Sequence, residues 1–415
     1  MRTKSNLVLA ALLVLAQMTA GMGEEPTRIS PEAKALLDQV SQAYSRLQSV
    51  ELNGTIRSSL PAAENPEGKT SPFTSAFEAP NKFRHSLEGK LLIGSTGQKA
   101  YVYQPSANAY VQGDIPKGKI SIDQLPAPIP QLLQAQNPSL LFAMIKDPIP
   151  SLASNMTEIS AGGPVMVNGA RYLPLRLFPR HGQERITWLV DPQTHLVKRF
   201  SVEVPPGELQ ALGMTDVLQK PARTEIDYST INVGVQYPAD HFAWTPPEGA
   251  RDMGAMLQQE ATNLVGRAAP DFTLSNLQGQ QSGLSEFKGQ VVVLDFWATW
   301  CQPCVRSLPE LAEFQKDVAG KKVQVFAVNL QEDRDKVQSF LEARRINVPV
   351  LLDPQGEMAQ KYHISAIPET VVIGRDGLVK KIFIGYTSQS MQELRDAVAA
   401  ALQEIPTATG REQRK

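Results

Sequence analysis

The sequence predicts two domains, an N-terminal α+β domain built on antiparallel strands and a C-terminal α/β domain built on a mixed sheet. Its 415 residues exceed one ordinary domain of roughly 150 residues. Between residues 50 and 232, short runs of alternating apolar and polar residues are separated by turn residues, a pattern typical of antiparallel strands. From residue 266 to 405 the pattern changes to alternating strands and helices. Hydrophobic residues at 42% and charged residues at 20% give an ordinary globular composition.

Residues 1–23 have the features of a secretory signal peptide. Arg2 and Lys4 precede an apolar run over 7–16, and small residues follow. Ten residues span only about 15 Å as a helix, half of a bilayer core, so a stable membrane anchor is disfavoured. The alternative is a buried N-terminal helix. We expect an exported protein, with the periplasm as its compartment.

Residues 30–250 are expected to form the first domain, which opens with an amphipathic helix over 31–50. Ser30 suits its N-cap and Pro31 its first turn. The apolar residues at helical spacing are Leu36, Leu37, Val40, Tyr44 and Leu47.

Strands are expected to follow that helix as an antiparallel meander. Turn residues at 64–68, 95–97 and 191–194 separate them. The expected elements are strands at 50–56, 72–79, 82–93, 100–111, 165–178 and 222–232, with a hairpin over 184–203.

A Pro- and Leu-rich segment over 122–153 interrupts the strands and predicts short helices or loops packed on the sheet. Such a segment can plug the concave face of a curved sheet, which gives a closed core. It can instead form a movable lid over an apolar cavity. We hypothesise a lid that captures an apolar ligand or a partner.

Charge and cysteine content exclude several classes. Lys+Arg is 41 and Asp+Glu is 42, so no basic excess exists for nucleic acid. The only cysteines are Cys301 and Cys304, too few for a disulfide framework or an iron–sulfur cluster. A zinc site is disfavoured because the histidines are scattered, at His85, His181, His195, His241 and His363. We therefore expect no metal site.

Residues 251–265 are expected to be a linker helix or coil, residues 266–405 the second domain, and residues 406–415 a disordered tail. The second domain alternates element types along the chain. Strands are expected at 291–296, 322–329, 348–353, 370–374 and 378–385, and helices at 302–318, 333–345, 356–362 and 390–404.

The cysteines lie where a buried strand ends and a helix begins. A helix N-terminus presents unpaired N–H groups and a positive dipole end, which stabilise a thiolate. We expect Cys301 to be the exposed cysteine with a lowered pKa. Cys304, one turn into the helix, can reach back to a mixed disulfide, and Pro303 suits the first turn. The strand–C-x-x-C–helix unit indicates thiol–disulfide exchange through this pair, without a further cofactor.

The second domain carries the motifs APDFTL at 269–274, DFWATWCQPC at 295–304, Pro309, AVNLQE at 327–332 and AIPET at 366–370. With these motifs it resembles the thioredoxin fold and, within it, the TlpA/ResA/CcmG-like periplasmic thiol–disulfide oxidoreductases. The helix over 333–345 matches the insertion of this subfamily. The resemblance implies a reductase of protein disulfides that is fed by a membrane electron donor.

Residue roles follow from that resemblance. Pro368 matches a cis-proline beside the disulfide, which fixes Ile367 for pairing with a substrate peptide. Asp295 matches a buried acid that takes the proton of Cys304, and Glu332 matches a glutamate near the active site; which of the two moves the proton stays open. The candidate substrate-binding residues are Trp300, Gln302, Pro303, Ile367 and Pro368, and Trp297 is expected in the core.

The first domain combines one N-terminal helix and many strands with the hairpin WLVDPQTHLVKRF and the closing FAWTPPEGA. In this pattern it resembles the LolA/LolB-like lipoprotein-carrier fold, a curved antiparallel β half-barrel with helices. This resemblance implies an apolar ligand, although a scaffold with a filled core fits equally well.

Two alternative functions remain open. A peroxiredoxin has a similar opening PDFTL strand, but its cysteine follows the pattern P-x-x-x-T-x-x-C, and here a single residue separates Thr299 from Cys301. The other alternative is a carrier of lipid or another apolar ligand, in which the redox domain is accessory.

Overall fold

The computed structural model describes residues 26–59, 69–153, 155–180, 183–206, 221–364, 366–386 and 389–404. The chain divides into two compact units between Met253 and Gly254. The expected signal peptide, the turn at 64–68, His181 and the expected tail lie outside the described residues. In the described part, none of the helices combines the length and apolar character that a membrane crossing requires.

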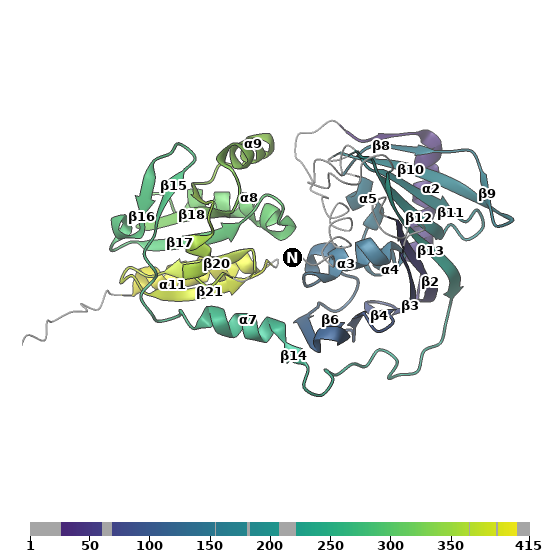
Figure 1. Ribbon diagram of the computed structural model, residues 1–415, viewed down its shortest axis with the longest axis horizontal. Coiled ribbons are helices and arrows are strands. Elements are labelled where there is room, and N and C mark those ends of the chain that lie inside the picture. Colours follow the sequence, from purple (N-terminus) through teal and green to yellow (C-terminus); the bar gives the residue numbers. More distant parts are fainter. Residues whose placement is uncertain are drawn as a thin grey trace, which may run out of the picture. The chain divides into compact units, whose positions relative to one another are not determined.

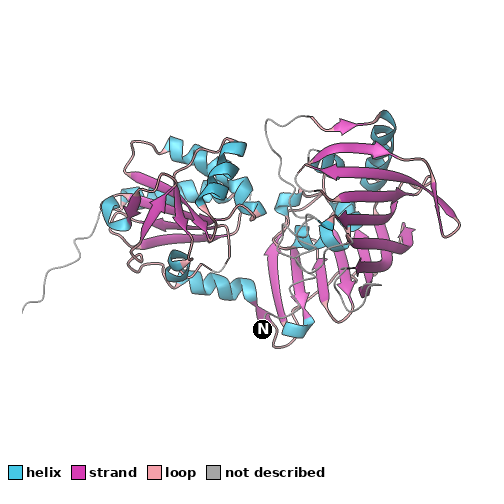
Figure 2. Cartoon of the chain, turned by 45° about the horizontal axis from the view of Figure 1, so that its top comes forward, coloured by secondary structure: helices cyan, strands magenta, loops and turns pink. Residues whose placement is uncertain are grey.

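The first unit is one curved sheet of 14 strands within the described residues, with helices against its concave face (Figures 1 and 2). Its first half consists of β1 (Arg28–Ile29), α2 (Pro31–Ser45), β2 (Ser49–Ser59), β3 (Lys69–Glu78), β4 (Lys82–Leu87), β5 (Leu91–Ser95), β6 (Lys99–Gln104), η2 (Pro105–Ala107) and β7 (Ala109–Asp114). Its second half consists of η3 (Ile122–Gln124), α3 (Ile129–Gln136), α4 (Pro138–Met144), α5 (Pro148–Ala153), β8 (Met156–Ala161), β9 (Val165–Val167), β10 (Ala170–Pro179), β11 (Arg185–Val190), β12 (Val197–Val204), β13 (Ala222–Val233) and β14 (Arg251–Asp252).

Helix α2 begins as predicted, because the Ser30 side chain accepts a hydrogen bond from the Ala33 N–H and Pro31 occupies the first turn. The predicted end at residue 50 is wrong. The helix ends at Ser45, and Ser49 already pairs with Glu78 in the sheet. The apolar residues expected on one helix face are all buried: Leu36, Leu37, Val40, Tyr44 and Leu47.

Three expected strands are hairpins. Residues 100–111 form β6 and β7, which turn through η2 and Asn108, where φ is 43°. Residues 82–93 form β4 and β5, which turn where Gly89 has a φ of 66°. Residues 165–178 form β9 and β10, which turn at Asn168 and Gly169, both with positive φ. A left-handed backbone reverses the chain within a run that alternation alone reads as continuous.

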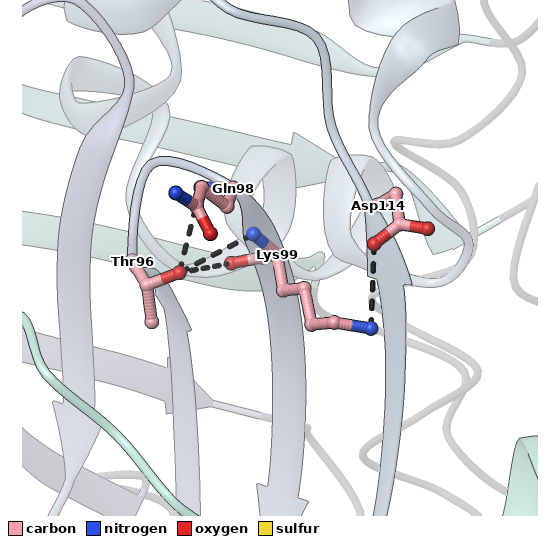
Figure 3. A network of polar contacts seen from close by, with 4 residues as sticks. All are labelled: Thr96, Gln98, Lys99 and Asp114. Carbon is pink, nitrogen blue, oxygen red and sulfur yellow. Dashed lines mark hydrogen bonds and ion pairs between the residues drawn. The ribbon is translucent and has the colours of Figure 1, made fainter.

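Two predicted turns are confirmed. Thr96 lies between β5 and β6, where its hydroxyl accepts from the N–H groups of Gln98 and Lys99, and the Lys99 ammonium pairs with Asp114 on β7 (Figure 3). In the β11–β12 hairpin, one carboxylate oxygen of Asp191 accepts from the N–H groups of Gln193 and Thr194. Local side-chain acceptors therefore fix both turns.

The segment over 122–153 forms short helices packed on the sheet, as predicted. Every residue of α4 is buried, and Leu140, Leu141 and Met144 belong to the same apolar core as the strands. The packing is that of the plug alternative, because these side chains close the core.

Buried hydrogen bonds also fasten this segment to the sheet. Asn137 donates to Ser75 Oγ at 2.7 Å and accepts from Tyr228 Oη at 2.8 Å. Ser75 Oγ lies 2.8 Å from His85 Nδ1, and Tyr44 Oη lies 2.6 Å from Ser139 Oγ. A lid would have to break this network to open.

The second unit holds a seven-stranded mixed sheet in the order β16-β15-β19-β18-β17-β20-β21, with helices on both faces (Figure 1). Its elements are α7 (Met253–Thr262), β15 (Thr273–Asn276), β16 (Gln281–Gly283), η4 (Leu284–Phe287), β17 (Val291–Trp297), α8 (Gln302–Asp317), β18 (Val323–Leu330), α9 (Arg334–Arg344), β19 (Val350–Asp353), α10 (Glu357–Lys361), β20 (Glu369–Ile373), β21 (Val379–Ile384) and α11 (Ser390–Gln403). The five strands and four helices expected from residue 291 onward are present; the β15–β16 hairpin was not predicted.

Two apolar cores lie on opposite faces of this sheet. Val291, Val293 and Trp297 of β17 join the core that contains both cysteines, whereas Val292 and Leu294 join the other core. All seven residues of β17 are buried, as expected of a central strand covered on both faces.

Candidate active site

The C-x-x-C lies at the N-terminus of α8. Cys301 is the N-cap residue, and its sulfur accepts a hydrogen bond from the Cys304 N–H at 3.2 Å. Pro303 falls in the first turn, where its missing N–H costs nothing. Strand β17 and helix α8 therefore fix the backbone on both sides of the cysteine pair.

Cys301 and Cys304 form a disulfide with their Cα atoms 5.2 Å apart. Cys301 is 5% exposed and Cys304 is fully buried. The expectation of an exposed Cys301 is correct only in relative terms, because the protein covers most of its surface. Of the two cysteines, only Cys301 keeps any exposure to solvent.

The residue before the cis-proline contacts the cysteine pair. The Ile367–Pro368 peptide bond is cis, and the carbonyl oxygen of Ile367 lies 3.6 Å from Cys301 Sγ. Pro368 is buried and Ile367 is half-buried. The structure thus brings Ile367 and Pro368, 66 and 67 residues along the chain, beside Cys301.

The two tryptophans near the cysteines differ in environment, as predicted. Trp300 is 62% exposed and immediately precedes Cys301, whereas Trp297 is fully buried. Pro303 is half-buried, and the side chain of Gln302 lies outside the described part of the chain. An exposed aromatic ring beside the reactive sulfur can contact a polypeptide substrate.

Asp295 is a buried carboxyl on the face of the sheet that α8 covers. Strand alternation gives it the same face as Val293 and Trp297, which pack in the core with both cysteines. Thr370 Oγ1 donates to its Oδ1 at 2.6 Å, and its Oδ2 has no hydrogen-bond partner among the described residues. Burial raises the pKa of Asp295 to about 7, and the Thr370 hydrogen bond opposes that rise.

Glu332, the other candidate acid, is held as a carboxylate. It accepts from the Thr299 N–H at 2.6 Å, the Thr299 hydroxyl at 2.5 Å and the Asn329 amide at 2.9 Å, and pairs with the Lys336 ammonium at 2.8 Å. Although burial acts to raise its pKa, these partners together lower it. Glu332 therefore fixes the backbone two residues before Cys301.

Four residues of this site were not predicted to act: Thr299, Asn329, Lys336 and Thr370. Thr299 and Thr370 stand within the motifs DFWATWCQPC and AIPET, but the sequence does not give the strand register that places them. Lys336 lies four residues after Glu332, a spacing that could have indicated the ion pair.

In the part of the chain that the structure describes, no group of three or more His, Cys, Asp or Glu side chains is placed to hold a metal ion.

Comparison with known proteins agrees with this geometry. The AhpC/TSA family model matches residues 265–382. The thiol–disulfide oxidoreductase ResA of Geobacillus thermodenitrificans is 37% identical over 121 residues, which are 29% of this chain and 70% of that protein. ResA of Bacillus subtilis is 36% identical over 126 residues, 30% of this chain and 70% of that protein.

A solved structure of a thioredoxin-family thiol:disulfide interchange protein from Chlorobium tepidum is 25% identical. The match covers 32% of this chain and 95% of that chain, with a TM-score of 0.30.

A cysteine pair joined at the start of a helix, on a sheet of this kind, defines a thioredoxin-fold thiol–disulfide oxidoreductase. The relatives give the family within that class. Through its C-terminal domain the chain belongs to the ResA-like thiol–disulfide oxidoreductases. Enzymes of this kind act on protein thiols and disulfides through their cysteine pair.

Proposed function

We propose that this protein is an exported reductase of protein disulfides, in which Cys301 attacks and Cys304 resolves. The observation that carries the proposal is the asymmetry of the pair, since Cys301 alone reaches solvent. The helix N-terminus stabilises a thiolate at that position.

The proposed reaction has two steps and transfers two electrons. The Cys301 thiolate attacks one sulfur of the substrate disulfide, which forms a mixed disulfide and expels the first substrate thiolate. The Cys304 thiol then loses its proton, and its thiolate attacks Cys301 Sγ. The second substrate thiolate leaves, and the Cys301–Cys304 disulfide forms.

Asp295 is the proposed acceptor of the Cys304 proton. A base is most useful when its pKa lies near the working pH, and the pKa of Asp295 is about 7. Glu332 is less suited, because four hydrogen-bonding partners occupy its carboxylate and hold its pKa low. Asp295→Asn should slow the second step more than the first.

The proposed reductase needs a supply of electrons. In an oxidising compartment a reductase must be re-reduced by a dithiol donor after each turnover. We propose a membrane-bound donor, as the family likeness suggests. Its docking surface would be that of the substrate, because only Cys301 of the pair is accessible.

Export rests on the apolar run and small residues of the first 23 residues. Expression of the full chain in a Gram-negative host would test it, followed by fractionation and N-terminal sequencing. A mature chain that starts near residue 24 in the periplasmic fraction supports export, and an uncleaved cytoplasmic chain contradicts it.

The reductase activity can be tested by the turbidity of insulin reduced in the presence of dithiothreitol. Cys301→Ser should lose all activity, and Cys304→Ser should accumulate mixed disulfides visible by mass spectrometry. Full turnover by Cys304→Ser would disprove the two-cysteine mechanism. Hydrogen peroxide consumption should be measured beside it, since rapid consumption without insulin reduction would favour the peroxiredoxin alternative.

The N-terminal unit has a proposed binding role, because it contains no cysteine and cannot exchange disulfides. The LolA-like resemblance favours an apolar ligand for this unit. The buried hydrogen bonds of Asn137 instead favour a fixed plug, and with it a partner-binding or structural role. Native mass spectrometry of the purified full chain, with displacement of a fluorescent fatty acid, decides between them. Bound lipid, or displacement of the fluorescent fatty acid, supports the carrier role. If neither is seen and acyl ligands leave the melting temperature of the protein unchanged, the carrier role is excluded.

A further inference from the structure

The environment of Asp295 is set by the two strands beside it. In the register of the sheet, Asp295 of β17 pairs with Thr370 of β20 on one side and with Ala327 of β18 on the other. Paired residues on neighbouring strands share one face of a sheet. Thr370 and Ala327 are therefore the cross-strand neighbours of the carboxyl.

Only one of these neighbours can donate a hydrogen bond. Ala327 is fully buried and has only a methyl group, whereas the Thr370 hydroxyl donates to Asp295 Oδ1 at 2.6 Å. The other oxygen, Oδ2, has no hydrogen-bond partner among the described residues. The carboxyl is thus fixed at one oxygen and open at the other.

We propose that Thr370 is a positioning residue of the redox reaction, which fixes the carboxyl of Asp295 and sets its affinity for the proton of Cys304. This inference rests on the proposed role of Asp295 as the acceptor. A hydroxyl donor stabilises the carboxylate over the neutral acid, so it opposes the effect of burial and keeps a fraction of Asp295 ionised at neutral pH. With Oδ1 occupied, Oδ2 is the oxygen that takes the proton.

The proton balance is closed within the proposed reaction. As Cys304 attacks Cys301 Sγ, its proton passes to Asp295 Oδ2, and the mixed disulfide breaks as the new disulfide forms. The protonated Asp295 then releases the proton to solvent or to the departing substrate thiolate. Thr370 keeps its own proton and is neither oxidised nor reduced.

The test uses a matched pair of variants of the full chain. Thr370→Val keeps the shape of the side chain and removes the donor, and Thr370→Ser keeps the donor. Stopped-flow mixing of reduced protein with a small aromatic disulfide gives both steps as a function of pH. In Thr370→Val we expect the midpoint of the pH dependence of the second rate constant to rise by about one pH unit. At pH 7 the second step should then be up to about tenfold slower than in the wild type. Thr370→Ser and the first step should match the wild type.

Each result has one meaning. If Asp295→Asn removes the pH dependence of the second step, an unshifted pH midpoint of that step in Thr370→Val overturns the role of Thr370. If Asp295→Asn keeps the wild-type pH dependence, Asp295 is not the acceptor, and the proposed function fails in that part. Should Thr370→Val not fold, carbon-13 NMR titration of the Asp295 carboxyl in Thr370→Ala replaces it, and an unchanged pKa there overturns the inference.

Discussion

Thr299 donates both its backbone N–H and its hydroxyl to the carboxylate of Glu332, at 2.6 and 2.5 Å. Thr299 lies two residues before Cys301, and Glu332 lies two residues after the end of β18. Two short hydrogen bonds to a charged acceptor are among the stronger polar contacts in proteins. They join the loop that carries Trp300 to the neighbouring strand of the sheet.

Glu332→Gln should therefore lower the free energy of unfolding of this domain by about 1–3 kcal/mol. The carboxylate's contribution is fully present above its unfolded pKa of 4.5 and is lost as the pH falls through its lower folded pKa. The pH midpoint of the rate of the resolving step should stay unchanged in Glu332→Gln. Urea titration measures the free energy of unfolding, and stopped-flow kinetics measure the rate of the resolving step.

Lys336→Gln is the matched control for Glu332→Gln. Lys336 is largely exposed, so loss of its ion pair should cost less than about 1 kcal/mol. A shifted pH midpoint in Glu332→Gln would show that Glu332, not Asp295, moves the proton.

Asp295→Asn should stabilise the oxidised protein at alkaline pH. The folded state keeps the carboxyl proton up to about pH 7, whereas the unfolded chain releases it near 3.8. The free energy of unfolding of the wild type therefore falls as pH rises between these values, by at most roughly 4 kcal/mol. Calorimetry at pH 8 should show a higher transition temperature for Asp295→Asn, and at pH 4 the difference should vanish. Equal transition temperatures at pH 8 would contradict a buried carboxyl with a raised pKa.

Trp300→Ala should weaken the use of protein substrates and spare small ones. The ring is 62% exposed beside the attacking sulfur, so its contacts are available to a polypeptide. We expect KM for a reducible protein to rise about five- to tenfold, as for loss of an interface anchor. The rate with a small aromatic disulfide should not change, and Trp300→Phe should lose less. An equal loss with both substrates would indicate that Trp300 shapes the Cys301 site itself.

The N-terminal unit should lose stability in mild acid through His85. Burial lowers the pKa of His85 to about 4, although its contact with Gln136 opposes this. The unfolded histidine takes up a proton near pH 6.5, so the free energy of unfolding falls between pH 6.5 and 4 by about 3 kcal/mol.

Hydrogen exchange of β3 and β4 as a function of pH measures this loss. His85→Gln should flatten the pH dependence, whereas His241→Gln, at a partly exposed ring, should not. If the exchange protection of the wild-type unit stays constant from pH 7 to 4, His85 does not destabilise the unit in acid.

Local sequence signals predicted the elements that local physics determines. Ser30 and Pro31 mark the start of α2, and the alternation from residue 291 onward predicts the strands and helices of the second unit. The C-x-x-C at the strand–helix junction was equally visible, because it needs no information about distant residues.

Contacts between distant segments could not be predicted in this way. The parallel pairing of β1 with β8 joins residues about 130 positions apart, and the sequence of neither strand indicates which strand it pairs with. Buried hydrogen bonds link Tyr44 to Ser139 and Ser139 to Tyr228, and these three residues lie far apart in the sequence. The Asp295–Thr370 hydrogen bond depends on the register between β17 and β20. The alternation of apolar and polar residues does not distinguish registers that differ by two residues, because such a shift leaves every side chain on the same face.

The reduction potential of the Cys301–Cys304 pair shows whether this protein works as a reductase. Equilibrium of the full chain with dithiothreitol or glutathione buffers at pH 7, scored by thiol alkylation and mass spectrometry, gives its value. We expect a reducing pair, at or below the roughly −270 mV of thioredoxin. A value near the roughly −120 mV of DsbA would contradict it and make this protein an oxidant of thiols.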